Sequence, residues 1–255
     1  MSLRKDRKIK GAEYRRILGQ PDHDPGLLAP GYRDFVDEFF YDGIGARTTL
    51  EMSDRFIPIL TAVCLNFNPG ATKRLIAAAL DKMLPPRAIV EIFIQVALYG
   101  GLPNTETALQ ISAEVFATRG IDLAENDNDQ RTLEELDTDG ARVMQELHGP
   151  RQDGGYASPN NPVTFALYQT AIRHGYGNLW MRPGLDLRQR TLCAIAGFTC
   201  IKLHGSLRKF AVSALNVGLS KDQVAEAAIQ TAPWNSFPIA LDALTVISEA
   251  LDSVE

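Results

Sequence analysis

The sequence predicts an all-α fold built from two similar halves, and three observations lead to that prediction. A pattern of residues returns after 135 positions without a gap, beginning with Arg55 and Arg190. Several long segments are rich in helix-forming residues. No segment shows the alternation of apolar and polar residues that is typical of a half-buried strand. The repeat divides the chain into two predicted units, 1–125 and 126–255.

The composition is that of an ordinary globular protein. Of the 255 residues, 45% are hydrophobic and 22% are charged, and the net charge is −5. Three cysteines are too few for a disulfide framework, and a net negative charge argues against non-specific binding to nucleic acid. There is no apolar run of the ~20 residues that a membrane helix needs, and the charged N-terminus resembles no secretory signal. We therefore expect a cytoplasmic protein with no membrane or nucleic-acid partner.

The predicted helices can be justified in chain order. The segments 54–65 and 190–203 are mostly apolar and longer than ordinary strands, which indicates buried helices. The segment 72–83 consists of good helix formers. The segment 86–99 begins with proline, which suits the first turn of a helix.

Helix ends can also be predicted from local chemistry. The segment 205–217 precedes Gly218, a favourable residue just past a helix C-terminus. Ser220 followed by Gln223 predicts a capping box at the start of the next helix. The acidic segment 122–139 is predicted to connect the halves, with a helix beginning near Thr132. The segment 152–162 has the Gly, Pro, Asn and Ser content of a loop.

A polar face recurs in both halves at steps of four residues, as Glu91, Gln95 and Tyr99 and again as Glu226, Gln230 and Trp234. The rest of each helix is apolar, so each glutamate is predicted either to be buried with a partner or to line a cavity. One interpretation is an acid–base or substrate-orienting carboxylate with a raised pKa. The other is a structural carboxylate, for which Arg55 and Arg190 are candidate partners.

The segments AIVEIFIQVALYGGLPNTETAL and QVAEAAIQTAPWNSFPIALDAL resemble the helix-and-turn signature of carboxymuconolactone decarboxylase-like proteins, within the alkylhydroperoxidase D-like superfamily. Tyr99-Gly100-Gly101-Leu102-Pro103 fits the turn of that family, and 234–238 fits it with Trp and Ser substitutions. The segments 140–150 and 176–192 resemble its lead-in region. The resemblance covers both halves.

The resemblance implies an all-α fold of duplicated alkylhydroperoxidase D-like units. It also implies a homo-oligomer, with a trimer favoured over a dimer. The implied activity is that of a cofactor-free carboxy-lyase, similar to 4-carboxymuconolactone decarboxylase, acting on a small carboxylated lactone or a related acid.

The sequence departs from the family pattern at the reacting groups. The decarboxylase pattern Glu-Leu-x-x-His falls on Ser206 and Phe210 in the second half, and on Ala71 and Leu75 in the first. The usual proton donor is therefore missing. The Cys-x-x-Cys pair of peroxidase-type relatives falls on Leu203 and Ser206, which predicts that thiol peroxidase chemistry is absent.

Candidate site residues follow from these patterns. Glu226 and Glu91 are the candidate acid–base carboxylates, and His204, near the start of the motif helix, is the candidate replacement for the missing histidine. The candidate substrate-binding residues are Arg190, Trp180, His174, Trp234 and Phe210. No metal site is predicted, because the four histidines are too dispersed to form a ligand set.

The sequence leaves three functions open. The first is a lyase whose site has been rebuilt without the family histidine. The second is a binding or assembly protein that has lost catalysis. The third is another small-molecule enzyme, such as an isomerase or hydrolase, on the same scaffold.

Overall fold

The computed structural model describes residues 4–21, 29–123, 129–152, 158 and 160–254 of the chain. Within these residues the fold is all-α, as predicted, with eleven α-helices and no strand. The first part contains α1 (Arg4–Ile17), α2 (Tyr32–Val36), the π-helix η1 (Asp37–Gly45), α3 (Met52–Leu65), α4 (Pro69–Asp81) and α5 (Pro86–Thr118). The second contains α6 (Leu133–His148), α7 (Pro162–Thr170), the π-helix η4 (Ala171–Tyr176), α8 (Leu187–Cys200), α9 (His204–Asn216), α10 (Lys221–Ile229) and α11 (Phe237–Asp252).

The two halves place their helices at matching positions in the sequence. The bounds of α3 and α8 differ by 135 residues at both ends, and so do those of α4 and α9. This is the offset at which the sequence pattern returns. The matching bounds support a repeat, and the division into units 1–125 and 126–255 stays a prediction.

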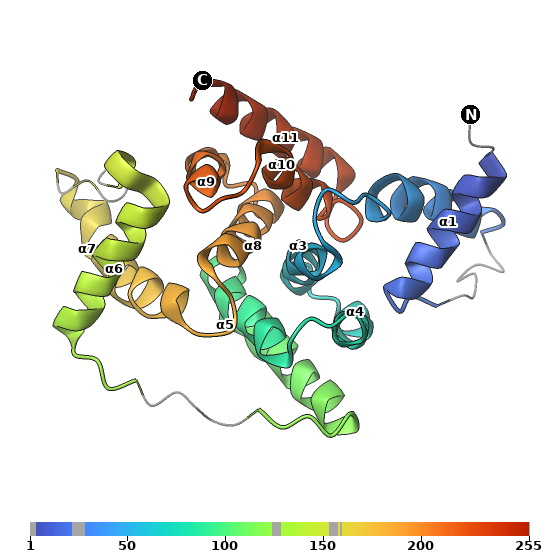
Figure 1. The fold of residues 1–255 in the computed structure, drawn as a ribbon, viewed down its shortest axis with the longest axis horizontal. Helices are drawn as coiled ribbons and strands as arrows, with labels where there is room; N and C mark the ends of the chain where they lie inside the picture. The colour runs from blue at the N-terminus through green and yellow to red at the C-terminus, as the bar shows by residue number, and fades with distance from the viewer. Residues whose placement is uncertain (1–3, 22–28, 124–128, 153–157, 159, 255) are drawn as a thin grey trace.

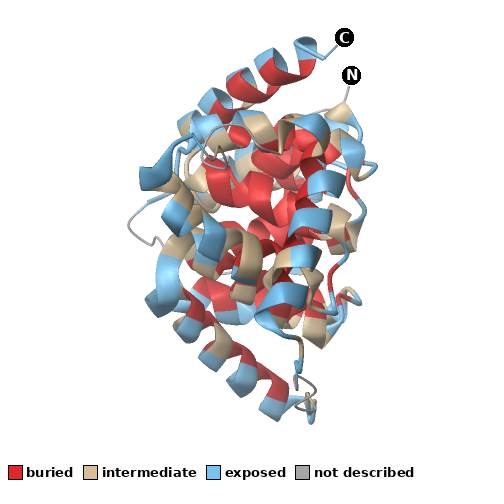
Figure 2. Cartoon of the chain, turned by 90° about the vertical axis from the view of Figure 1, so that its left-hand side faces the viewer, coloured by how far each residue is buried: buried red, intermediate tan, exposed pale blue. Residues whose placement is uncertain are grey.

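Two buried helices, α3 and α8, pack against each other at the centre of the molecule (Figure 1). The pair formed by α1 and η1 lies at one end, and the pair formed by α6 and η4 lies at the other. One hydrophobic cluster includes Phe56 and Ile92 from the first half and Ile195 and Val224 from the second. The halves therefore share a core, which appears in Figure 2 as buried segments between exposed outer faces.

Most of the predicted helix boundaries are confirmed within one turn. Ser220 and Thr132 both form capping boxes, at the starts of α10 and α6. The predicted helix 190–203 ends earlier in the structure, because α8 ends at Cys200 and residues 201–203 form the turn that leads to α9. Gly101 has a φ of +73°, a conformation that favours glycine, and it kinks α5 inside the predicted turn.

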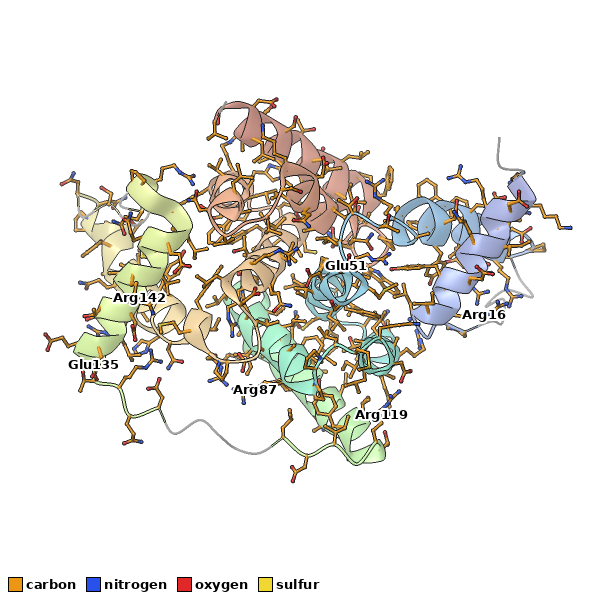
Figure 3. All side chains as sticks on the ribbon, viewed as in Figure 1. Arg16, Glu51, Arg87, Arg119, Glu135 and Arg142 are labelled. Atoms are coloured by element: carbon orange, nitrogen blue, oxygen red, sulfur yellow. The ribbon has the colours of Figure 1, made fainter. Side chains whose placement is uncertain are left out.

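Charged side chains lie mainly on the outer surfaces of the helices, as the labelled Arg16, Arg119 and Arg142 show in Figure 3. No helix in the described part of the chain has both the length and the apolar character needed to cross a membrane. Most of the predicted loop 152–162 lies outside the described residues.

Candidate active site

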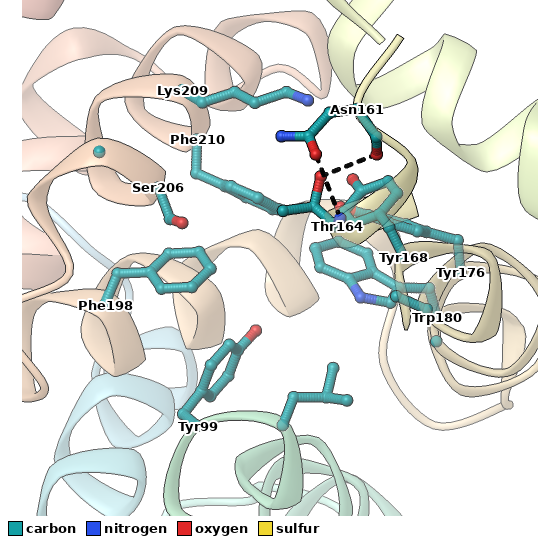
Figure 4. A pocket seen from close by; sticks show the side chains of 14 residues that line it. Tyr99, Asn161, Thr164, Tyr168, Tyr176, Trp180, Phe198, Ser206, Lys209 and Phe210 are labelled. Atoms are coloured by element: carbon teal, nitrogen blue, oxygen red, sulfur yellow. Dashed lines mark hydrogen bonds between the residues drawn. The ribbon is translucent and has the colours of Figure 1, made fainter. Parts of the chain in front are cut away.

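A cavity of about 650 Å³ lies in the second half, next to the helix that carries the family motif. Its walls come from α7, η4, α8 and α9, and α5 of the first half closes one side. The polar and aromatic lining residues are Tyr99, Asn161, Thr164, Tyr168, Tyr176, Trp180, Phe198, Ser206, Lys209 and Phe210 (Figure 4). Lys209 is the one charged residue among the lining residues. The cavity therefore has largely aromatic walls and a few polar groups, the arrangement typical of a small-molecule site.

Tyr99 reaches this cavity from the other half of the chain, and its hydroxyl points into the space (Figure 4). The Gln95 Nε2 donates to the Tyr99 hydroxyl at 3.3 Å and to the Arg190 carbonyl at 2.8 Å, while Arg190 donates to the Gln95 Oε1 at 3.2 Å. The amide is thereby held with its NH₂ toward Tyr99. Because the Tyr99 oxygen accepts from Gln95, its own hydrogen is left to point into the cavity. Burial raises the pKa of Tyr99, which keeps this hydrogen in place.

A glycine on α8 makes the approach of Tyr99 possible. A Cβ at Gly197 would lie 2.6 Å from the Tyr99 ring, a distance that real side chains do not reach. The ring also meets Phe198 edge-on, with 5.1 Å between the ring centroids. Gly197 and Phe198 of α8 thus determine where the ring of Tyr99, from α5, lies.

Glu91 lies behind Tyr99 and is completely buried. Its carboxylate accepts from Arg190 at 3.0 Å, from Arg182 at 3.1 Å and from Arg87 at 2.9 Å. Of the two candidate partners, Arg190 therefore pairs with Glu91, and the pair joins the two halves. Neither residue lines the cavity. Through Gln95 this ion-pair network holds Tyr99.

Glu226 lies in the corresponding network of the other half and is also completely buried. It accepts from the Arg47 Nε at 2.7 Å and from the Gln230 Nε2 at 2.8 Å. The candidate partner Arg55 instead donates to the backbone carbonyls of Gly45 and Arg47. Glu226 is likewise absent from the lining of the cavity. A catalytic role for either glutamate stays a prediction that this geometry does not support.

The other candidate residues are divided between the cavity and the surface. Trp180 and Phe210 line the cavity and pack against each other, with ring centroids 5.9 Å apart. His204 is exposed at the first turn of α9, and His174 is exposed on η4. Neither histidine is a lining residue, and neither is the partly buried Trp234.

One histidine that the candidate set omitted is buried directly beside the cavity. His148, the last residue of α6, is 1% exposed, and its ring meets that of Phe210 at 5.0 Å. Its Nδ1 lies 2.7 Å from the Ser213 hydroxyl, and its Nε2 lies 3.2 Å from the hydroxyl of the lining residue Tyr176. Burial, with contributions from Lys209 and Arg151, lowers the pKa of His148 to about 3, so the ring is neutral at neutral pH.

The cysteines take no visible part in this site. Cys193 is fully buried, and burial raises the pKa of the Cys193 and Cys200 thiols to about 12. Thiols with such pKa values are poor nucleophiles.

Residues 166–249, in the second half of the chain, match the model of the carboxymuconolactone decarboxylase family. That range contains most of the cavity lining, from Tyr168 to Phe210. Among curated proteins, the chain is 24% identical to the nitrosuccinic acid decarboxylase npaB of Metarhizium robertsii over 116 residues. The matched region is 46% of this chain and 81% of that protein. The predicted family resemblance is confirmed for the second half.

Proposed function

We propose that this protein is a carboxy-lyase that removes CO₂ from a small carboxylic acid bound in the cavity beside Tyr99 and Lys209. The observation that carries the proposal is the Tyr99 hydroxyl, held by Gln95 as a hydrogen-bond donor inside the family domain's cavity. The family match and the decarboxylase relative support the reaction class.

The proposed reaction needs two things from the protein. One group must bind the negatively charged substrate, and another must stabilise the negative charge that develops in the transition state. When the bond to the leaving carboxylate breaks, its electron pair stays on the neighbouring carbon and spreads onto a carbonyl or nitro oxygen. A donor directed at that oxygen lowers the barrier. Tyr99 is such a donor, and Lys209 attracts a carboxylate. The carbanion then takes up one proton from solvent water, and CO₂ and the protonated product leave.

The proposal is tested by measuring CO₂ release from nitrosuccinate and from 4-carboxymuconolactone, each corrected for its uncatalysed rate. We expect turnover of at least one acid, and a loss of about 10²-fold in kcat for Tyr99→Phe. Lys209→Met should mainly raise KM, by about tenfold. Tyr41→Phe is the matched control, because Tyr41 is a tyrosine outside the cavity lining. Turnover of neither acid, or an unchanged rate in Tyr99→Phe, would refute the proposal.

A binding role without turnover is the second candidate, and one observation favours it. Ser206 and Phe210 line the cavity at the positions where the family pattern has Glu and His. If both acids raise the Tm without losing CO₂, the cavity is a binding site and the lyase proposal fails.

A further inference from the structure

The hydrogen-bond network around His148 fixes which of its ring nitrogens carries the hydrogen. Ser213 has one hydroxyl hydrogen, which it donates to the Lys209 carbonyl at 2.9 Å, and it accepts from Arg151 at 3.2 Å. Its bond to His148 forms together with these two only if the His148 Nδ1–H donates. The Nε2 is then an acceptor, and the Tyr176 hydroxyl donates to it.

This assignment determines how Tyr176 meets the cavity. The hydroxyl hydrogen of Tyr176 is donated to His148, so the Tyr176 oxygen can only accept hydrogen bonds from its other neighbours. Tyr99 meets the same cavity as a donor. In the cavity wall, Tyr176 is therefore a hydrogen-bond acceptor and Tyr99 is a hydrogen-bond donor.

The first half shows that the fold does not require this polar chain. Ala78 lies 135 positions before Ser213 on the matching helix. A Cβ at Gly19 would lie 3.6 Å from the Ala78 Cβ and 3.1 Å from the Arg74 carbonyl. Gly19 and Ala78 are thus neighbours in the first half. Ala78 has no hydroxyl, so the matching helix of the first half lacks a counterpart of the Ser213–His148 hydrogen bond. Buried polar groups are costly unless every one is paired.

We propose that His148 is a positioning residue that turns Tyr176 into the hydrogen-bond-accepting wall of the cavity. The preferred ligands are then small acids that carry a hydrogen-bond donor, such as a hydroxyl or an un-ionised carboxyl, in addition to the carboxylate. The inference rests on the proposed function, because it assigns the same cavity to the substrate, and it is tested by binding rather than by turnover.

Malate and succinate are suitable probes because they differ by one hydroxyl. We expect calorimetry to show that the unmodified protein binds malate about fivefold more tightly than succinate, the value of one net hydrogen bond. Tyr176→Phe should abolish this preference. His148→Phe should abolish or reverse it, because the Tyr176 hydrogen is then released toward the cavity. Lys209→Met should weaken both acids by a similar factor and keep the ratio.

Ser213→Ala is a second variant in case another variant fails to fold. We expect it to fold, because alanine is the residue at the matching position of the first half. It frees the His148 ring to change its tautomer, so it should also reduce the preference. Equal ratios in the unmodified protein and His148→Phe, or no binding of either acid, would overturn the inference. A shifted ratio without CO₂ release would leave it standing while the lyase proposal fails. Turnover with an unshifted ratio would do the reverse.

Discussion

The two halves of the chain place α4 and α9 at matching positions but surround them differently. In the second half Ser206 and Phe210 line a cavity of about 650 Å³. The matching residues of the first half, Ala71 and Leu75, are buried in the hydrophobic core. The same helices can thus form either solid core or the wall of a site.

One buried hydrogen-bonded pair also differs between the halves. His148 and Ser213 form a hydrogen-bonded pair beside the cavity, whereas Ala78, at the position that matches Ser213 in the first half, lies next to Gly19. The buried glutamates, in contrast, occur in both halves. The glutamates, present in both halves, are therefore best explained by the fold, whereas the His148–Ser213 pair is confined to the half that has the cavity.

The largest expected effect is a difference in the loss of stability when each of the two glutamate networks is disrupted. Glu91→Leu should destabilise the protein by about 3–5 kcal/mol, because it leaves the completely buried Arg190 without its carboxylate. Glu226→Leu should cost about 1 kcal/mol, because the side chain of Arg47 is 43% exposed and can turn to water. Urea unfolding of both variants measures the difference. Equal losses would show that the networks are energetically equivalent despite their different exposure.

The second effect is a pH dependence that belongs to the cavity half alone. The pKa of His148 is lowered from 6.5 to about 3, so between these values the unfolded chain binds a proton that the folded chain does not. Stability therefore falls as pH decreases through this window, by about 1.4 kcal/mol per pH unit from this residue. Lys209 and Arg151, which face the ring, act in the same direction.

Urea unfolding between pH 6 and pH 4 tests this contribution. His148→Gln should remove it and give a shallower dependence than the unmodified protein. His174→Gln is the control, because His174 is exposed. Parallel curves for all three proteins would mean that His148 is protonated in the folded state.

Local chemistry made much of the fold predictable. The capping residues Ser220 and Thr132 were predictable because a cap depends on neighbouring residues in the chain. The repeat was predictable because it is recognised from residue identity alone. The pairing of Glu91 with Arg190 was predictable because the repeat singled out both residues.

The cavity was harder to predict. Tyr99 faces the second half because Gly197 admits its ring, and His148 meets Ser213 across 65 positions. Such contacts depend on how α5 and α6 pack, which no local pattern records. His204 is the opposite case: it is close to the motif in sequence but exposed in the structure and absent from the cavity lining, and its catalytic role stays a prediction.

The smallest expected effect compares the starts of the two central helices. Asp186, the N-cap of α8, accepts from the Gln189 amide at 2.7 Å in a capping box, whereas Glu51, 135 positions earlier, makes no side-chain cap on α3. Asp186→Ala should therefore cost about 1 kcal/mol, and Glu51→Ala less than about 0.5 kcal/mol. Thermal unfolding of the two variants compares the two helix starts, which lie at matching positions of the two halves. If the two losses were equal, the cap would add nothing to a helix that packing against the shared core already stabilises.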